Sequence, residues 1–189
     1  MTQEVLLTNE NYIRGITVID NNVQSKFLLS AIREAQDVGL QQIVGSPMLN
    51  KLKYLVYEDL ITLEANSAYK NLIDECQLYL AYQAIANLCL TTNVKISNGG
   101  LQQTTDENLT TLTVSDTFII RDHYQGKADF YAKRLQDYIL NNRQNLPEIS
   151  ERKCNQMNAE LHSAATTSAW LGGKRSPVGG WLNKRYKRF

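Results

Sequence analysis

The sequence predicts a mainly α fold: a four-helix bundle with a small β-hairpin or long loop, an extended N-terminal arm and an extended C-terminal tail. Four segments repeat apolar residues at spacings of three and four, the period of a helix with one buried face. Short breaks rich in Gly, Asn and Thr separate these segments, and the 189 residues include only three prolines. We expect one compact helical domain at residues 20–146, an arm at 1–19, and a linker with a docking tail at 147–189.

Composition excludes several classes of protein. With 43% hydrophobic and 21% charged residues, the chain has the make-up of a soluble globular domain and not of a disordered one. No apolar run approaches the roughly 18 residues that span a bilayer, and the start of the chain lacks the basic region of a signal peptide. We therefore expect neither membrane insertion nor secretion.

The first expected element is the arm at 1–19, where short apolar patches show no helical stripe. An amphipathic helix should follow from Val23 to Val38. Residues Asp20 to Asn22 are suited to cap its start, and Gly39 or Gly45 can end it in the left-handed conformation that Gly adopts cheaply. The expected core face consists of Val23, Phe27, Leu28, Ala31, Ile32, Ala35 and Val38.

A second, shorter helix is predicted over residues 46–59. Ser46 can accept hydrogen bonds from unpaired helix amides, and Pro47 suits the first helical position because no donor is lost there. Met48, Leu52, Leu55 and Val56 give this helix a core face, and Tyr54 and Tyr57 widen its apolar arc.

The two longest helices are predicted over 67–91 and 116–142. The first is apolar on two stripes, which indicates a central helix, and the second carries a Tyr-rich apolar stripe opposite a charged face. Between them, residues 92–115 change to Thr, Asn and alternating β-branched residues, with Asn98-Gly99-Gly100 as a turn signal. We expect a hairpin or a long loop there. Leu146-Pro147 should end the helical domain, because a residue before proline is driven out of helical geometry.

No catalytic, metal or cofactor site is predicted. Cys76, Cys89 and Cys154 are odd in number and widely spaced, which favours reduced, structural thiols over a disulfide framework. His123 and His162 belong to no spaced set of metal ligands, and no glycine-rich loop matches a phosphate-binding motif. We therefore expect a protein that is not an enzyme.

The C-terminal tail carries the strongest functional signal. Residues 161–189 contain six basic residues and no acidic one, so a net charge of +1 leaves −5 for the rest of the chain. Both tryptophans also lie in this stretch. Aromatic and Arg side chains dominate binding hot spots, which favours docking onto a protein partner. Direct binding to nucleic acid and a merely solubilising terminus remain open. The predicted partner-binding residues are Trp170, Lys174, Arg175, Trp181, Lys184, Arg185, Tyr186, Lys187, Arg188 and Phe189.

The order of these segments resembles the head–tail connector, or adaptor, proteins of tailed bacteriophages, especially those of crAss-like phages. The likeness covers residues 20–142: an opening amphipathic helix, the Gly45-Ser46-Pro47 break, a short second helix, a long apolar third helix, a loop and a long fourth helix. The stretch 172–189 is similar to the C-terminal segments that some adaptors insert into neighbouring subunits or the portal.

The resemblance implies a structural virion protein. It implies a homo-oligomeric ring, usually of twelve subunits, in the neck of the particle, assembled in the host cytoplasm. Its partners would be the portal protein and other neck or tail proteins, with genomic DNA passing through a central channel without sequence-specific binding. The alternative is a nucleic-acid-binding accessory protein that uses the same basic, aromatic tail.

Overall fold

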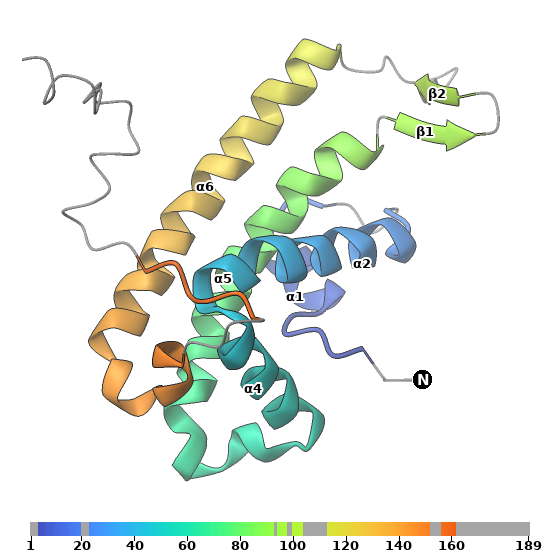
Figure 1. Cartoon of the computed structure of the whole chain (residues 1–189). Helices are drawn as coiled ribbons and strands as arrows, with labels where there is room; N and C mark the ends of the chain where they lie inside the picture. Colours follow the sequence, from blue (N-terminus) through green and yellow to red (C-terminus); the bar gives the residue numbers. More distant parts are fainter. Residues whose placement is uncertain are drawn as a thin grey trace, which may run out of the picture.

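The computed structural model describes residues 4–19, 23–92, 94–97, 100–103, 113–151 and 156–161, and these residues form a mainly helical protein (Figure 1). No helix among them is long and apolar enough to cross a membrane. In chain order the elements are α1 (Glu10–Ile16), α2 (Ser25–Glu34), the π-helix η1 (Ala35–Leu40), α3 (Gln41–Val44), α4 (Ser46–Tyr57), the 3-10 turns η2 (Leu60–Thr62) and η3 (Glu64–Asn66), α5 (Ser67–Thr92), β1 (Val94–Ser97), β2 (Gly100–Gln103), α6 (Val114–Asn141), and the 3-10 turns η4 (Arg143–Asn145) and η5 (Pro147–Ser150).

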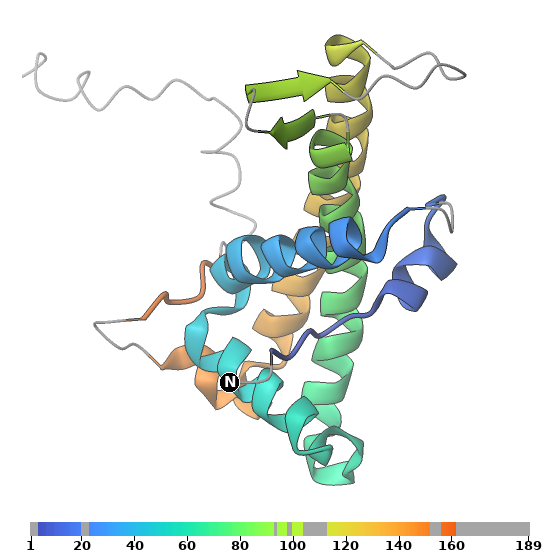
Figure 2. The same cartoon turned by 90° about the vertical axis from the view of Figure 1, so that its right-hand side faces the viewer.

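Helices α5 and α6 form an antiparallel pair that lies side by side in both views (Figures 1 and 2). The two apolar stripes of α5 correctly predict a central helix, because it packs on α6 and also supports α2 and η1. Cys76, Leu80 and Ala84 on α5 are completely buried. The stripe predicted on α6 is confirmed as well, with Ala128 and Leu135 completely buried. The pair thus supplies the centre of the hydrophobic core.

The first predicted helix runs farther than expected, because η1 joins α2 to α3 without a break. A π-helical turn contains more residues than an α-helical one, so it shifts the apolar face of the residues that follow. Leu40 is completely buried as a result, whereas Val38 is 58% exposed although a regular helix would place it in the core. Phe27, also assigned to the core face, is 37% exposed. Leu28, Ala31, Ile32 and Ala35 are buried as predicted.

The predicted start of this helix is wrong, and of the two glycines predicted to end it only one does so. Residues 20–22 lie outside the described residues, and Gln24 occupies the N-cap of α2 without a side-chain capping bond. Gly39 does not end the helix. It lies within η1, where a Cβ would collide with the hydroxyl of Tyr79 on α5, so glycine makes room for that buried ring. Gly45 is the residue that ends the helical run, at φ 79°.

The N-terminal segment is not wholly the extended arm that its sequence predicts, because residues 10–16 form helix α1. The Asn9 side chain caps this helix by accepting a hydrogen bond from the Tyr12 amide at 2.8 Å. Ile13 is completely buried in the common core. A helix of seven residues is too short for its apolar period to stand out in the sequence.

The residues before α1 are extended, but two glutamines fix them to the body. The Gln36 side chain is completely buried; its Oε1 accepts a hydrogen bond from the Leu7 amide at 2.9 Å and its Nε2 donates to the Val5 carbonyl at 3.1 Å. Gln77 on α5 donates to the Leu7 carbonyl at 3.0 Å. These side chains satisfy main-chain groups that burial would otherwise leave unpaired. Leu7, only 3% exposed, is therefore part of the core.

Between α5 and α6 the chain forms a short two-stranded antiparallel ribbon. The register pairs Val94 with Gln103 and Ser97 with Gly100. The ribbon lies at the far end of the α5–α6 pair, away from α4 (Figure 2). It falls within the segment 92–115 for which the sequence predicts a hairpin or long loop.

Candidate assembly surfaces

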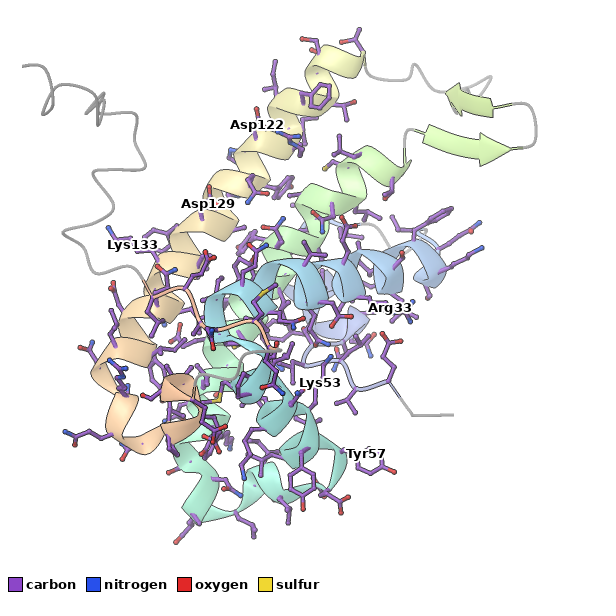
Figure 3. The ribbon with its side chains drawn as sticks, in the orientation of Figure 1. Arg33, Lys53, Tyr57, Asp122, Asp129 and Lys133 are labelled. Atoms are coloured by element: carbon purple, nitrogen blue, oxygen red, sulfur yellow. The ribbon has the colours of Figure 1, made fainter. Side chains whose placement is uncertain are left out.

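All ten predicted partner-binding residues, from Trp170 to Phe189, lie outside the described residues, as do His162 and Cys154. The structure therefore locates the point from which the tail leaves the body, and the surfaces that the body offers to partners. Figure 3 draws the side chains of the described residues on the ribbon.

The body extends farther along the chain than the predicted boundary at Leu146-Pro147. Leu146 is completely buried, and Ile149 in η5 is 7% exposed. Residues 156–161 then run from α4 toward α6 (Figure 1). The Glu160 amide donates to the Gln42 carbonyl at 3.0 Å, and Gln136 on α6 donates to the Glu160 carbonyl at 3.1 Å. Residues 147–150 and 156–161 of the predicted linker thus belong to the body.

Ser46 and Met157 form the centre of this packing, which we call the Ser46–Met157 clasp. The Ser46 amide donates to the Met157 carbonyl at 2.8 Å, and the Met157 amide donates to Ser46 Oγ at 3.2 Å. Ser46 is the first residue of α4. Its hydroxyl accepts hydrogen bonds from Met157 and Gln41. The sequence predicts that Ser46 caps its own helix, and the structure shows no such capping bond. A Cβ on Gly45 would lie 2.7 Å from the Ala159 amide nitrogen, so glycine also permits the close approach of this segment.

The outer face of α6 is a candidate surface for self-association. Ile119 and Phe130 point away from α5 and are 66% and 65% exposed. His123 and Gly126 complete a stripe with spacings of four, three and four residues, the seam of helices that pack lengthwise. An added Cβ on Gly126 would have no neighbour within 4 Å, so no contact among the described residues requires glycine at that position. We call these four residues the α6 stripe.

Charged residues border the α6 stripe. Asp122, Asp129 and Lys133 lie along the same outer side of the helix (Figure 3). Asp122 pairs with Arg121 at 2.6 Å, and Asp129 accepts a hydrogen bond from Gln125 at 2.9 Å. Charges of both signs at the rim of an apolar strip are typical of protein interfaces.

Several side-chain contacts join α5 to α6 in the half of the pair that is nearer to the ribbon. The rings of Tyr82 and Tyr131 stack at 5.2 Å with an interplanar angle of 3°. The amides of Gln83 and Gln125 donate to each other at 3.1 and 3.0 Å. Lys127 Nζ lies 5.6 Å from the centre of the Tyr82 ring. A side-chain hydrogen-bond pair and a stacked pair together fix the register of the two helices.

A second candidate surface lies at the turn between α4 and α5, which we call the acidic corner. Tyr54, Tyr57 and Leu63 are 52%, 59% and 52% exposed, although the sequence assigns the two tyrosines to the apolar arc of α4. Tyr57 projects outward at this end of the molecule (Figure 3). Residues 54–69 contain three acids and no Lys or Arg. The acids are Glu58, Asp59 and Glu64, all exposed and without an ion pair to any described residue.

The backbone of the acidic corner is well defined. Asp59 adopts the left-handed conformation at φ 53°, which short polar side chains tolerate better than others and which turns the chain out of α4. The Asn66 side chain donates to the Leu60 carbonyl at 2.8 Å and closes the turn before α5. Lys51 Nζ lies 5.9 Å from the Tyr54 ring centre, which places a cation on that ring. The corner therefore presents its carboxylates and aromatic rings from a single closed turn.

The described cysteines and the described histidine lie in surroundings typical of residues with a structural role. Cys76 is completely buried, and burial strongly raises the pKa of its thiol. Cys89 is partly buried, which also raises its pKa. His123 is exposed and makes an edge-on contact with Tyr124. No group of three or more His, Cys, Asp or Glu among the described residues could hold a metal ion.

Residues 40–158 match the sequence model of a family of unknown function, DUF6712. The chain belongs to this family. The DUF6712 match includes the acidic corner, the α5–α6 pair and both residues of the Ser46–Met157 clasp, but neither α1 nor the C-terminal tail. Searches of curated proteins and of solved structures return no match.

Proposed function

We propose that this DUF6712 member is a structural virion protein. In this proposal, copies of the chain form a ring in the neck of a tailed bacteriophage, join the portal to the tail and leave a channel for DNA. The ring, with about twelve subunits, assembles in the host cytoplasm. The C-terminal tail docks on the portal or on a neighbouring subunit. The activity is mechanical, and the body acts by positioning its surfaces.

The observation that carries this proposal is the α6 stripe. Ile119 and Phe130 leave most of their surface in water, and burying such a side chain against a partner is worth roughly 1.5–3 kcal/mol. Gly126 lowers the intrinsic stability of α6 by about 1 kcal/mol relative to Ala, and no described neighbour within this chain requires it. A second copy packed along α6 would use both features.

The arrangement of the helices supports an adaptor-like body. Helix α2 packs on α5, and α4 contacts α3, η2 and η5 and adds buried residues to the same core. The elements follow the order expected from the resemblance, and the ribbon β1–β2 extends the far end of the α5–α6 pair. The stacked tyrosines and the glutamine pair between α5 and α6 suit a part that transmits force without bending. These features support a four-helix adaptor with a hairpin extension.

The ring is tested by the mass of the purified full chain in solution, alone and with its portal. The variant Ile119→Glu/Phe130→Glu should remain a folded monomer under both conditions, because charges replace the two apolar side chains that the proposed interface would bury. Val38→Glu is the matched control, since Val38 is 58% exposed on a different element. The control should assemble like the unmodified chain. Equal assembly of both variants would contradict the proposed interface.

Docking on the portal is tested by deleting residues 172–189. The shortened chain should keep its helical content and thermal unfolding, because the described core ends at residue 161. It should lose attachment to the portal in reconstituted assembly. Full attachment without the tail would overturn the docking part of the proposal.

The alternative function is nucleic-acid binding through the same tail. Six basic residues, accompanied by aromatic ones, suit phosphate contacts and base stacking. The net charge of −5 on the rest of the chain disfavours it, since the body would repel the same phosphates. DNA binding by the full chain that falls steeply with added salt, and that disappears on deleting 172–189, would favour this alternative.

A further inference from the structure

The acidic corner gathers three exposed carboxylates within residues 58–64, and no Lys or Arg occurs in residues 54–69. Five acidic residues elsewhere have an Arg or Lys within reach: Glu4 pairs with Arg33, Glu10 with Arg14, Asp37 with Lys53, Glu75 with Arg134 and Asp122 with Arg121. Glu58, Asp59 and Glu64 have no such partner among the described residues. They therefore leave a local negative charge on the surface.

Exposed rings lie next to this negative charge. Tyr54 and Tyr57 are one helical turn apart on α4 and are both more than half exposed, and Leu63 adds an aliphatic contact from the following turn. Faces of aromatic rings attract Lys and Arg, as the position of Lys51 beside Tyr54 illustrates. The corner thus suits a ligand that is basic and aromatic at once.

The C-terminal segment 170–189 has this composition. It contains six basic residues, no acidic residue, and the rings of Trp170, Trp181, Tyr186 and Phe189. Its charge is opposite to that of the corner, and its aromatic residues match the exposed rings there. We propose that the acidic corner binds segment 170–189 of a neighbouring copy of this chain, an inference that rests on the proposed ring.

The course of residues 156–161 favours a neighbouring copy over the same copy. Met157 is held at the start of α4, while Glu160 is already bound to Gln136 on α6. The chain therefore heads toward α6 as it leaves the body, and the acidic corner lies at the other end of α4 (Figure 1). The chain thus leaves the body beside α6, and α6 carries the stripe that is proposed to contact the next subunit.

The distance is compatible with this arrangement. Residues 162–169 can span at most about 3.4 Å each before Trp170, or roughly 25–30 Å in all. That length is comparable to the width of a small helical domain. Trp170 can therefore reach an adjoining subunit while the body of its own subunit stays in place.

The first experiment measures binding of a fluorescent peptide of residues 170–189 to the chain ending at Leu161. We expect saturable binding that weakens as salt is added, because opposite charges are brought together. The variant Glu58→Gln/Asp59→Asn/Glu64→Gln should bind about tenfold more weakly, as expected for the loss of three exposed charge contacts. Asn suits the left-handed backbone at residue 59, so this variant keeps the fold. Affinity unchanged by these substitutions would overturn the inference.

A matched control neutralises three other acids: Glu34→Gln/Asp74→Asn/Asp137→Asn. These residues are exposed and lie outside the acidic corner, so the total charge changes equally. Peptide affinity should fall less than twofold. A fall equal to that of the corner variant would show a non-specific attraction and would contradict a defined site. Tighter binding of the peptide to duplex DNA than to the body at the same salt would also overturn the inference.

The second experiment separates a neighbouring copy from the same copy. Full chains carrying a photoreactive residue in place of Trp181 are mixed in heavy and light isotope forms and irradiated. Cross-links between the photoreactive residue at position 181 and residues 54–64 should join heavy to light chains. Cross-links only within one chain would overturn binding between copies. The peptide assay uses a body that need not form a ring, so failure of the α6 stripe and failure of the acidic corner are distinguishable.

Discussion

The main chains of Ser46 and Met157, 111 residues apart, are joined by one backbone hydrogen bond, and the Ser46 hydroxyl accepts a second from the Met157 amide. Ser46 is only 8% exposed, so water cannot easily replace Met157 as a partner. The clasp connects the start of α4 to the last described segment of the chain. It makes the fold depend on residues that follow η5.

Replacing Ser46 with Ala should lower the free energy of unfolding by about 1–2 kcal/mol, because the Met157 amide and the Gln41 side chain would both lose the acceptor that they share. Urea denaturation measures this change. Ser25→Ala is the control, since Ser25 makes an exposed hydrogen bond to Glu10. The control should cost less than about 0.5 kcal/mol. Equal losses for the two variants would mean that the clasp adds nothing.

Ending the chain at two positions should distinguish the packed segment from the tail. A chain that ends at Glu151 loses the contacts of Met157, Ala159 and Leu161, and its thermal midpoint should fall by several degrees. A chain that ends at Leu161 keeps these contacts and should unfold like the full chain. Scanning calorimetry provides the comparison. Identical midpoints for the two chains would mean that residues 156–161 add no stability, and would support the domain boundary predicted at residue 147.

Gly39→Ala should destabilise the protein although Ala favours a helix. The new methyl group would collide with the hydroxyl of Tyr79, whose ring is 5% exposed and cannot swing into solvent. We expect a loss of about 1–3 kcal/mol, the usual cost of overpacking. Adding Tyr79→Phe removes the colliding oxygen and should recover most of the loss. A double-mutant cycle by denaturation tests this, and additive effects would refute the collision.

Tyr69 should contribute stability that alkaline pH removes. Its hydroxyl donates to Glu148 at 2.8 Å; burial, with that bond and the Glu148 charge, raises the pKa of Tyr69 to about 12. A pKa raised above its unfolded value of 10.0 means that the contribution is complete below pH 10. It is lost as the pH rises from 10 towards 12.

The comparison is with Tyr69→Phe, measured by denaturation at several pH values. The full chain should be more stable than Tyr69→Phe by about 1–2 kcal/mol at neutral pH, because a hydrogen bond to a charged acceptor is lost. This difference should stay constant up to about pH 10 and shrink above it. A constant difference up to pH 11.5 would contradict the raised pKa.

Apolar periodicity predicts the long helices well because packing on both sides enforces it. Ser67–Thr92 and Val114–Asn141 differ from the predicted helices by two residues or fewer at each end. The start of α6 has a signal that the apolar pattern ignores: Thr113 caps the helix and bonds to Asp116 three residues later. Attention to capping pairs would have placed that start correctly.

Apolar periodicity alone does not predict three features of the structure, and each has a physical reason. The π-helix η1 changes the phase of its own helix, so residues after it no longer follow a period of 3.6. Residues 156–161 are held largely through main-chain groups, which every sequence possesses. The exposure of Tyr54 and Tyr57 depends on where the neighbouring helices end, and the period of α4 contains no information on that.

The clasp also sets an order of events during synthesis. Ser46 is made 111 residues before Met157, and at about 5–20 residues per second its amide waits roughly 5–20 s for a partner. Until then the junction between α3 and α4 stays incomplete, whatever the state of the α5–α6 pair. The body therefore closes only after the residues that lead into the C-terminal tail have been made. A nascent chain cannot offer its tail to another subunit before its own junction is able to close.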